Sequence, residues 1–181
     1  VMDPARNALI AEHARTLYHE GRNVYVFSDR LSHLIDIAKL LEVPVEYDVK
    51  AADGDAGEGD EEEVTSDYDL PVANVVSLKG GASKEEIAQA RGVGRIILTT
   101  YKYSGTGLSI SKMNSIILAT PRKSNLTQIV GRIYRLDGDA SIQRIIVDIV
   151  DVNTPMKSQY PYRKKTYVSL GADIIPSKAD I

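Results

Sequence analysis

Short, uninterrupted runs of apolar and β-branched residues recur along this chain, separated by segments with helical periodicity. A strand buried on both faces gives such a continuous run, whereas a half-exposed strand alternates apolar and polar residues. We predict strands over 23–28, 43–47, 74–78, 95–100, 115–120, 143–150 and 172–176. Strands of this kind that alternate with helices are typical of an α/β domain with a mainly parallel sheet and helices on both faces.

Helix-start signals lie between these strands. Asp3 and Pro4 supply a cap and a first-turn proline, and Asp29 supplies a second cap. Ser83 and Glu86 have the spacing of a capping box. We predict helices over 4–20, 30–42, 84–91 and 126–135, and a further helix within 155–170. A chain of 181 residues with 43% hydrophobic residues suits one such domain.

The residue inventory excludes several kinds of site. The chain has no Cys, so disulfides and thiolate metal sites are excluded. His13, His19 and His33 lack metal-binding spacing with acidic residues, so we predict no metal ligand and expect all three at the surface. No apolar run approaches the ~18 residues of a membrane span, so we expect a soluble, intracellular protein without a membrane partner. Because Met2 is the second residue, we expect a piece of a longer protein.

Charge is distributed unevenly along the chain. The formal net charge is −3, but residues 46–69 hold 11 of the 25 acidic residues and one of the 22 basic residues. The remainder therefore has 21 basic and 14 acidic residues, a balance of +7. We predict a basic body, which favours phosphate-bearing partners, with a disordered acidic insertion at about 50–69. The insertion is either passive or a competitor for the basic surface.

Hydroxyl and glycine residues gather where the predicted strands end. In parallel sheets the carboxyl ends of the strands share one edge, where loops offer N–H and OH groups to phosphates. The residues concerned are Ser28, Gly80, Gly81, Thr99, Thr100, the segment 103–109, Thr120 and Pro121. Each residue alone is weak evidence for a phosphate site, but their recurrence at successive strand ends is stronger evidence.

The segment 126–135 predicts an amphipathic helix with a bare polar stripe. Its apolar residues, at i, i+3, i+4 and i+7, are Leu126, Ile129, Val130 and Ile133. Gln128, Arg132 and Arg135 share the opposite face, with no acidic residue to pair with them. Gly131 costs about 1 kcal/mol of helix propensity relative to Ala, which suggests a close approach to the backbone. The stripe is either a solvated face or a binding face.

Five segments together resemble the C-terminal RecA-like domain of superfamily 2 helicases and translocases. They are VYVFS (24–28), SLKGGASKEEIAQAR (77–91), IILTTYKYSGTGLSI (96–110), IILATP (116–121) and QIVGRIYR (128–135). The last matches the Q-x-x-G-R-x-x-R form of motif VI. The resemblance covers about residues 7–150 and implies a RecA-like three-layer α/β/α domain. The extension 151–181 is similar to that of phage recombination helicases and XPB-type translocases.

The resemblance implies roles for individual residues. Arg132 and Arg135 would be arginine fingers that reach the ATP γ-phosphate, with Gln128 beside the attacking water. Gly107, Ser109 and Gly131 would lie at the ATP, where Ser109 replaces the family's usual acid: its hydroxyl can still hydrogen-bond a ribose but brings no charge. The nucleic-acid contacts would be Ser28, Gly80, Gly81, Thr99 and Thr100. In this domain alone the Gln128, Arg132 and Arg135 stripe should therefore be exposed and unpaired, or should hold a stray anion.

The chain has no phosphate-cradling G-x-x-x-x-G-K-[ST] motif and no D-E-x-[DH] acidic box. The resemblance implies that both lie on a separate N-terminal RecA-like domain, which would hold most of the ATP and Mg²⁺. The implied partners are that domain and DNA, with RNA as a second candidate. A non-catalytic nucleic-acid or protein interaction module is the alternative function.

Two basic segments keep two interpretations each. Arg122 and Lys123 either contact a nucleic-acid phosphate or form part of a solvated turn. The segment 160–167 mixes three tyrosines with Arg163, Lys164 and Lys165. It is either a nucleic-acid patch or an amphipathic helix that packs its tyrosines on the sheet.

Overall fold

The computed structural model describes residues 3–41, 74–104, 110–134, 139 and 141–177. The predicted strand at 43–47 and the predicted insertion at 50–69 lie outside these residues. No helix among the described residues is long and apolar enough to cross a membrane.

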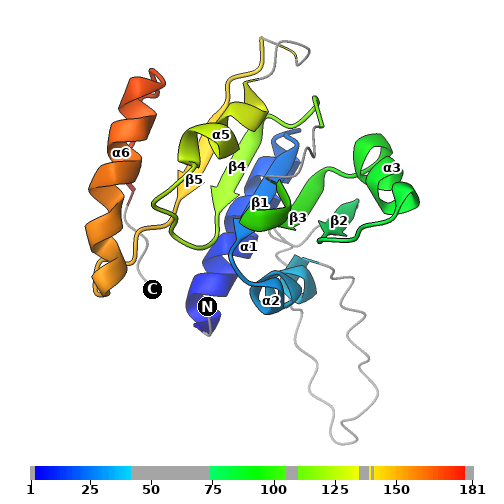
Figure 1. Cartoon of the computed structure of the whole chain (residues 1–181), viewed down its shortest axis with the longest axis horizontal. Helices are drawn as coiled ribbons and strands as arrows, with labels where there is room; N and C mark the ends of the chain where they lie inside the picture. Colours follow the sequence, from blue (N-terminus) through cyan, green and yellow to red (C-terminus); the bar gives the residue numbers. More distant parts are fainter. Residues whose placement is uncertain (1–2, 42–73, 105–109, 135–138, 140, 178–181) are drawn as a thin grey trace, which may run out of the picture.

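A parallel sheet of five strands forms the middle layer of the described structure (Figure 1). The strands are β1 (Val24–Ser28), β2 (Val75–Leu78), β3 (Ile96–Thr100), β4 (Ser115–Leu118) and β5 (Ile145–Asp148). Their order is β2-β3-β1-β4-β5, and every pairing is parallel. The predicted α/β fold is therefore confirmed, and each predicted strand from 23–28 to 143–150 within the described residues is present.

Helices connect and cover these strands. The α-helices are α1 (Pro4–His19), α2 (Leu31–Leu41), α3 (Lys84–Gly92), α4 (Tyr101–Ser104), α5 (Leu126–Val130) and α6 (Tyr160–Ser169). Among the described residues, the 3₁₀ helix η2 (Gly131–Ile133) directly follows α5, and the 3₁₀ helix η3 (Pro155–Gln159) directly precedes α6. Asp3 caps α1 and Ser83 with Glu86 forms the predicted capping box of α3.

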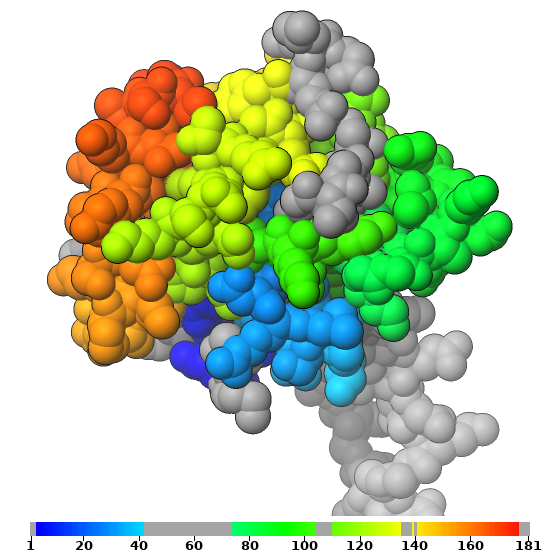
Figure 2. Space-filling view, in the orientation of Figure 1, coloured from blue at the N-terminus to red at the C-terminus, as the bar shows by residue number. Residues whose placement is uncertain are grey.

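The sheet separates two apolar cores, as continuous strand runs predict. On one face, α1 and α2 pack on Val24, Val26 and Leu98. On the other face, α5 and α6 pack on Tyr25, Phe27 and other alternate strand residues. Figure 2 shows α6 along one side of the molecule and α3 along the opposite side. The three layers leave the carboxyl ends of β1, β3 and β4 together at one edge.

The segment 126–135 differs from the prediction of one regular helix. The α-helix ends at Val130, and the chain continues as a 3₁₀ turn through Ile133. Asn125 precedes the helix in a left-handed conformation, with a φ of 59° and no side-chain cap. Because 3₁₀ geometry has three residues per turn, the predicted polar stripe does not keep its 3.6-residue register.

Two further predictions were wrong. Residues 172–176 form no strand. Asp29 does not cap α2, because the helix begins at Leu31 and Arg30 is the residue that directly precedes it. The Asp29 carboxylate instead accepts a hydrogen bond from Arg122, 93 residues away, which local sequence does not reveal.

Helix α6 is anchored to the sheet by buried polar contacts. Arg163 is 1% exposed, and its Nε donates to Asp148 Oδ2 at 2.7 Å. The Tyr167 hydroxyl donates to the same oxygen at 2.8 Å. For these two residues the packing interpretation of the segment 160–167 is the correct one. Tyr162, Lys164 and Lys165 remain exposed.

Replacing Arg163 with Ala should therefore destabilise the fold. Removing one partner of a buried ion pair leaves the other charge uncompensated, at a typical cost of about 3 kcal/mol. Urea unfolding followed by circular dichroism measures this loss. The exposed neighbour Lys164→Ala is the control and should change stability by less than about 0.5 kcal/mol. Equal effects of both variants would contradict the anchoring role of Arg163.

Candidate functional site at the carboxyl edge of the sheet

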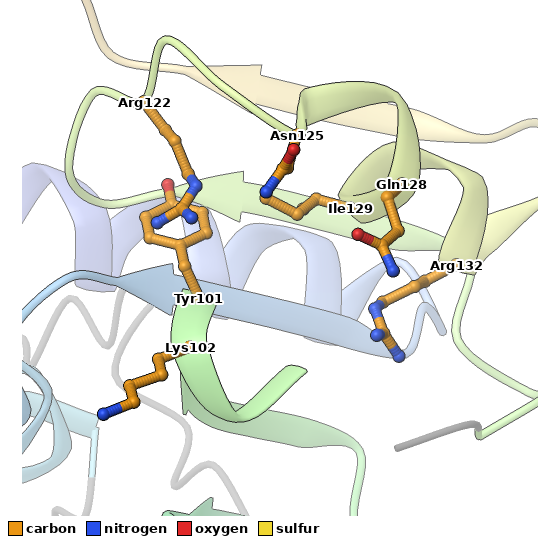
Figure 3. Close-up of a pocket in the computed structure, with 7 residues that line it drawn as sticks. All are labelled: Tyr101, Lys102, Arg122, Asn125, Gln128, Ile129 and Arg132. Carbon is orange, nitrogen blue, oxygen red and sulfur yellow. The ribbon is translucent and has the colours of Figure 1, made fainter. Parts of the chain in front are cut away.

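A hollow of about 170 Å³ opens at the carboxyl edge, beside α5. Its lining residues are Tyr101, Lys102, Arg122, Asn125, Gln128, Ile129 and Arg132 (Figure 3). Three of these side chains are cationic, two carry amides and none carries a carboxylate. The composition favours an anion that can accept several hydrogen bonds, such as a phosphate group.

Arg122 is held in place from three directions. Its Nη1 donates to Asp29 Oδ1 at 3.0 Å, and its Nε donates to the Ser124 carbonyl at 3.1 Å. The guanidinium lies over the Tyr101 ring (Figure 3), at a distance of 4.7 Å from the ring centre. The side chain is 24% exposed, so its charge stays accessible from the hollow. It is therefore a fixed cation, which a solvated turn would not provide.

The floor of the hollow is rigid. Tyr101 is 3% exposed and stacks on Phe27, with ring centres 5.5 Å apart. Its hydroxyl donates to the Thr120 carbonyl at 2.7 Å. Burial raises the pKa of the Tyr101 hydroxyl, so that it remains a donor at all ordinary pH values. Thr120 in turn accepts the Asp29 N–H through Oγ1 at 2.9 Å.

The stripe residues differ from the expectation of full exposure. Gln128 is exposed, and Arg132 lies beside it in the wall of the hollow (Figure 3). Arg132 is only 7% exposed, so the predicted exposure of this residue was wrong. The 3₁₀ turn at Gly131–Ile133 turns its side chain toward the domain. Arg135 lies outside the described residues.

Gly131 is exposed, and a Cβ added there would meet no described atom within 4 Å. Nothing described in this domain therefore explains the glycine. Gly107 and Ser109, the other predicted ATP-contacting residues, lie outside the described residues.

Two of the predicted nucleic-acid contacts are buried. Ser28 and Thr99 are both 0% exposed, so neither side chain can touch a backbone phosphate at the surface. Their side chains were therefore wrongly predicted as direct contacts. Thr100 is partly exposed, but its Oγ1 accepts the Tyr103 N–H at 3.3 Å.

Gly80 and Gly81 form an exposed turn after β2. Gly81 has a φ of +83°, which glycine adopts without strain. Lys123 is also exposed, and its ammonium lies 4.5 Å from the centre of the Tyr162 ring. These three residues remain accessible to a partner.

His33 was expected at the surface and is instead 0% exposed. Its Nδ1 lies 3.0 Å from Ser28 Oγ, and its Nε2 lies 2.9 Å from Asn7 Oδ1. Because Asn7 Oδ1 can only accept, His33 Nε2 is the donor of that bond, and the Ser28 hydroxyl, which accepts the Arg30 N–H at 3.1 Å, donates its own proton to Nδ1. His33 then carries its proton on Nε2 and is neutral. The network fixes the loop that holds Asp29.

Sequence reasoning missed Tyr101, Lys102, Asn125 and the partner role of Asp29. Tyr101 and Lys102 directly follow Thr100 in the quoted motif, so their position at a strand end was an available signal. The contacts of Asn125 and Asp29 depend on strands that are distant in sequence, and no local pattern marks them.

Solved structures define the class of fold. The crystal structure of T4 UvsW matches with a TM-score of 0.58 and 19% identity, over 91% of this chain and 32% of that chain. The C-terminal part of the Fun30 ATPase domain matches with a TM-score of 0.58 and 13% identity, over 88% of this chain and 46% of that chain. S. cerevisiae Dbp5 bound to RNA and ADP BeF3 matches with a TM-score of 0.51 and 12% identity, over 93% of this chain and 37% of that chain. Identities of this size show the fold alone.

Proteins similar in sequence point to a narrower group of proteins than the fold does. The chain is 42% identical over 113 residues to a candidate ATP-dependent RNA helicase of African swine fever virus. It is 29% identical over 163 residues to a candidate ATP-dependent RNA helicase of Acanthamoeba polyphaga mimivirus. The matches cover 62% and 90% of this chain, but only 22% and 26% of those proteins. No model of a known protein family matches the chain.

The chain thus has a RecA-like α/β fold like that of the domains in these solved structures, and it is similar in sequence to viral proteins that are named as ATP-dependent RNA helicases. The likeness to phage recombination helicases or XPB-type translocases stays a prediction.

Burial of His33 generates a pH dependence. Burial, followed by nearby positive charges that include Arg6, lowers its pKa from 6.5 to about 4. The unfolded chain therefore binds a proton that the folded chain rejects, so stability is full above about pH 6.5 and is lost as the pH falls. This single group should cost about 2 to 3 kcal/mol between pH 7 and pH 4.5.

Urea unfolding at both pH values measures that loss. His33→Gln should remove the contribution of His33 to the pH dependence of the free energy of unfolding. The variant should therefore be less stable than wild type at pH 7, and the difference should become smaller as the pH falls. His19→Gln, at an exposed position, should keep the wild-type pH profile. A His33→Gln profile parallel to wild type would contradict a neutral, buried His33.

Proposed function

We propose that the chain is the C-terminal motor domain of an ATP-dependent nucleic-acid helicase or translocase. ATP and Mg²⁺ would be held mainly by an N-terminal RecA-like domain, across a cleft that includes the carboxyl-edge hollow. The core would be about residues 7–150, with the insertion at 50–69 and the extension 151–181 as additions. The cationic hollow beside Gln128 and Arg132 is the observation that carries this proposal.

The chemistry of the hollow fits a triphosphate. Guanidinium groups stay charged and fork onto phosphate oxygens, and they stabilise charge that develops during phosphoryl transfer. Arg132 would act from the wall of the hollow and Arg135 from the segment that follows. Gln128 would orient the attacking water. The burial of Arg132 supports preorganisation, because a guanidinium held by its surroundings loses little conformational freedom on binding.

Arg122 is better suited to this hollow than to a nucleic-acid track. Its salt bridge to Asp29 and its stacking on Tyr101 direct it toward the lining shared with Gln128. Arg122 would therefore contact the nucleotide in the hollow and not, as predicted from the sequence, the nucleic-acid backbone.

The nucleic-acid backbone would contact the exposed Gly80–Gly81 turn and Lys123. Ser28 and Thr99 would act from inside the fold by shaping the strand ends rather than by touching phosphate. The viral relatives are named as RNA helicases and the Dbp5 structure contains RNA, which favours RNA at least as much as the DNA predicted first.

A non-catalytic interaction module is the alternative. Such a module would keep the fold and a basic surface but need no arginine at the hollow. Finger variants separate the two functions, because only a motor loses ATP turnover while it keeps nucleic-acid binding.

Arg132→Ala and Arg135→Ala should each lower the kcat of the full-length protein by about 10³ or more, measured as phosphate release with saturating single-stranded RNA or DNA. Affinity for the nucleic acid should change little. Lys164→Ala, on the exposed side of α6, is the control and should keep full turnover. The isolated 181-residue chain should release no phosphate. Full turnover by the arginine variants, or turnover by the isolated chain, would refute the motor proposal.

A further inference from the structure

Four basic residues line the edge of the sheet opposite the hollow. Arg95 and Arg144 directly precede β3 and β5, and Arg22 and Lys112 come two and three residues before β1 and β4. These strands are consecutive neighbours in the order β3-β1-β4-β5. Since neighbouring strands lie about 4.8 Å apart, the row extends over roughly 14 Å. We name Arg22, Arg95, Lys112 and Arg144 the amino-edge basic row.

Hydrogen bonds to backbone carbonyls link the members of the row. Arg95 Nη2 donates to the carbonyls of Tyr18 and Arg22, each at 2.9 Å. Arg22 Nη1 donates to the Gln143 carbonyl at 2.7 Å, next to Arg144. Lys112 Nζ donates to the Gly92 carbonyl at 2.8 Å. These bonds fix the cations in place, but a carbonyl carries no formal charge and does not neutralise them.

Carboxylates offset only part of this charge. Glu20 pairs with Arg22 at 2.9 Å. Asp139 lies near Arg144, but its Oδ1 accepts the N–H and hydroxyl of Ser141 at 2.9 and 2.6 Å. Burial is the main cause that lowers the pKa of Lys112, and the charge of Arg95 lowers it further, so these two cations lie close enough to repel each other. An added anion would relieve that repulsion.

A second hollow, of about 280 Å³, lies within the row. Its lining includes Lys112 and Arg144, the amides of Asn23 and Asn114, the apolar Ile142, and the carboxylate of Asp139, whose Oδ1 already accepts from Ser141. Asn114 Oδ1 accepts the Asn23 N–H at 3.2 Å, and Asn23 Nδ2 donates to the Lys112 carbonyl at 3.1 Å, so its floor is rigid. Ile142 is 38% exposed and offers a surface for a sugar or base.

From these contacts we propose that the amino-edge basic row is a second binding surface, which takes the sugar-phosphate backbone of a single-stranded nucleic acid. A linear row of fixed cations beside a rigid hollow suits a chain of phosphates better than one small anion. The surface lies at the opposite end of the strands from the carboxyl-edge hollow, so it can be occupied independently of ATP. It adds a contact that the proposed motor cycle does not require.

The first test measures the salt dependence of binding. Fluorescence anisotropy follows a fluorescein-labelled single-stranded oligonucleotide, as DNA and as RNA, on the 181-residue chain. Lys112→Gln combined with Arg144→Gln should weaken binding and reduce the slope of log K against log salt by about 1.4, or about 0.7 for each lost phosphate contact. Lys157→Gln, at an exposed cation on η3 and outside every proposed contact, should leave the slope unchanged. An unchanged slope for the amino-edge pair overturns the proposal.

The second test uses the unaltered chain, so that it does not depend on how a variant folds. Lysine acetylation read by mass spectrometry should show Lys112 protected by the oligonucleotide, while the exposed Lys157 on η3 stays reactive. Inorganic tripolyphosphate and polyglutamate at equal charge are the comparison arms, and both should protect Lys112 less. Equal protection by tripolyphosphate would show a free-phosphate site, and equal protection by polyglutamate would show a site for acidic proteins. Either result, or a fully reactive Lys112 at saturating oligonucleotide, refutes the proposal.

Discussion

The parallel direction of all five strands is the constraint on which the rest of the structure depends. Parallel strands need crossover connections, which place helices on both faces and bury both sides of the sheet. The same direction brings every carboxyl end to one edge. Ser28, Thr100 and Thr120 are far apart in sequence and lie at neighbouring strand ends for this reason. The candidate site is thus a consequence of the topology before it is a consequence of any motif.

Buried polar groups at that edge must find partners, and this requirement shapes the site. His33, Ser28 and Asn7 satisfy one another inside the fold. The loop that they hold presents Asp29, which fixes Arg122 over the Tyr101 ring. A chain of satisfied donors and acceptors therefore connects the interior of the domain with a cation at its surface. Residues that motif matching assigns to direct contact can instead serve by holding others in place.

Sequence patterns correctly predicted the features of secondary structure that depend on residues close together in the chain. The run at 24–28 specifies a buried strand, and Ser83 with Glu86 specifies a helix start, because both effects are local. The single helix over 126–135 was wrong because apolar spacing marks the buried face but does not show where the α-helix gives way to a 3₁₀ turn. Burial of Arg132 and His33, and the pairing of Asp29 with Arg122, depend on contacts between distant elements, which periodicity does not encode.

Charge illustrates the same division between local and tertiary information. The sequence shows that the body outside residues 46–69 is basic by +7, but it does not show where the excess lies. Parallel topology places residues that precede strands at one edge and residues that follow strands at the other. Lys102, Arg122 and Arg132 come after the ends of strands, whereas the residues of the amino-edge basic row come before the starts of strands. One modest surplus of charge is thereby divided between two opposite edges of the sheet.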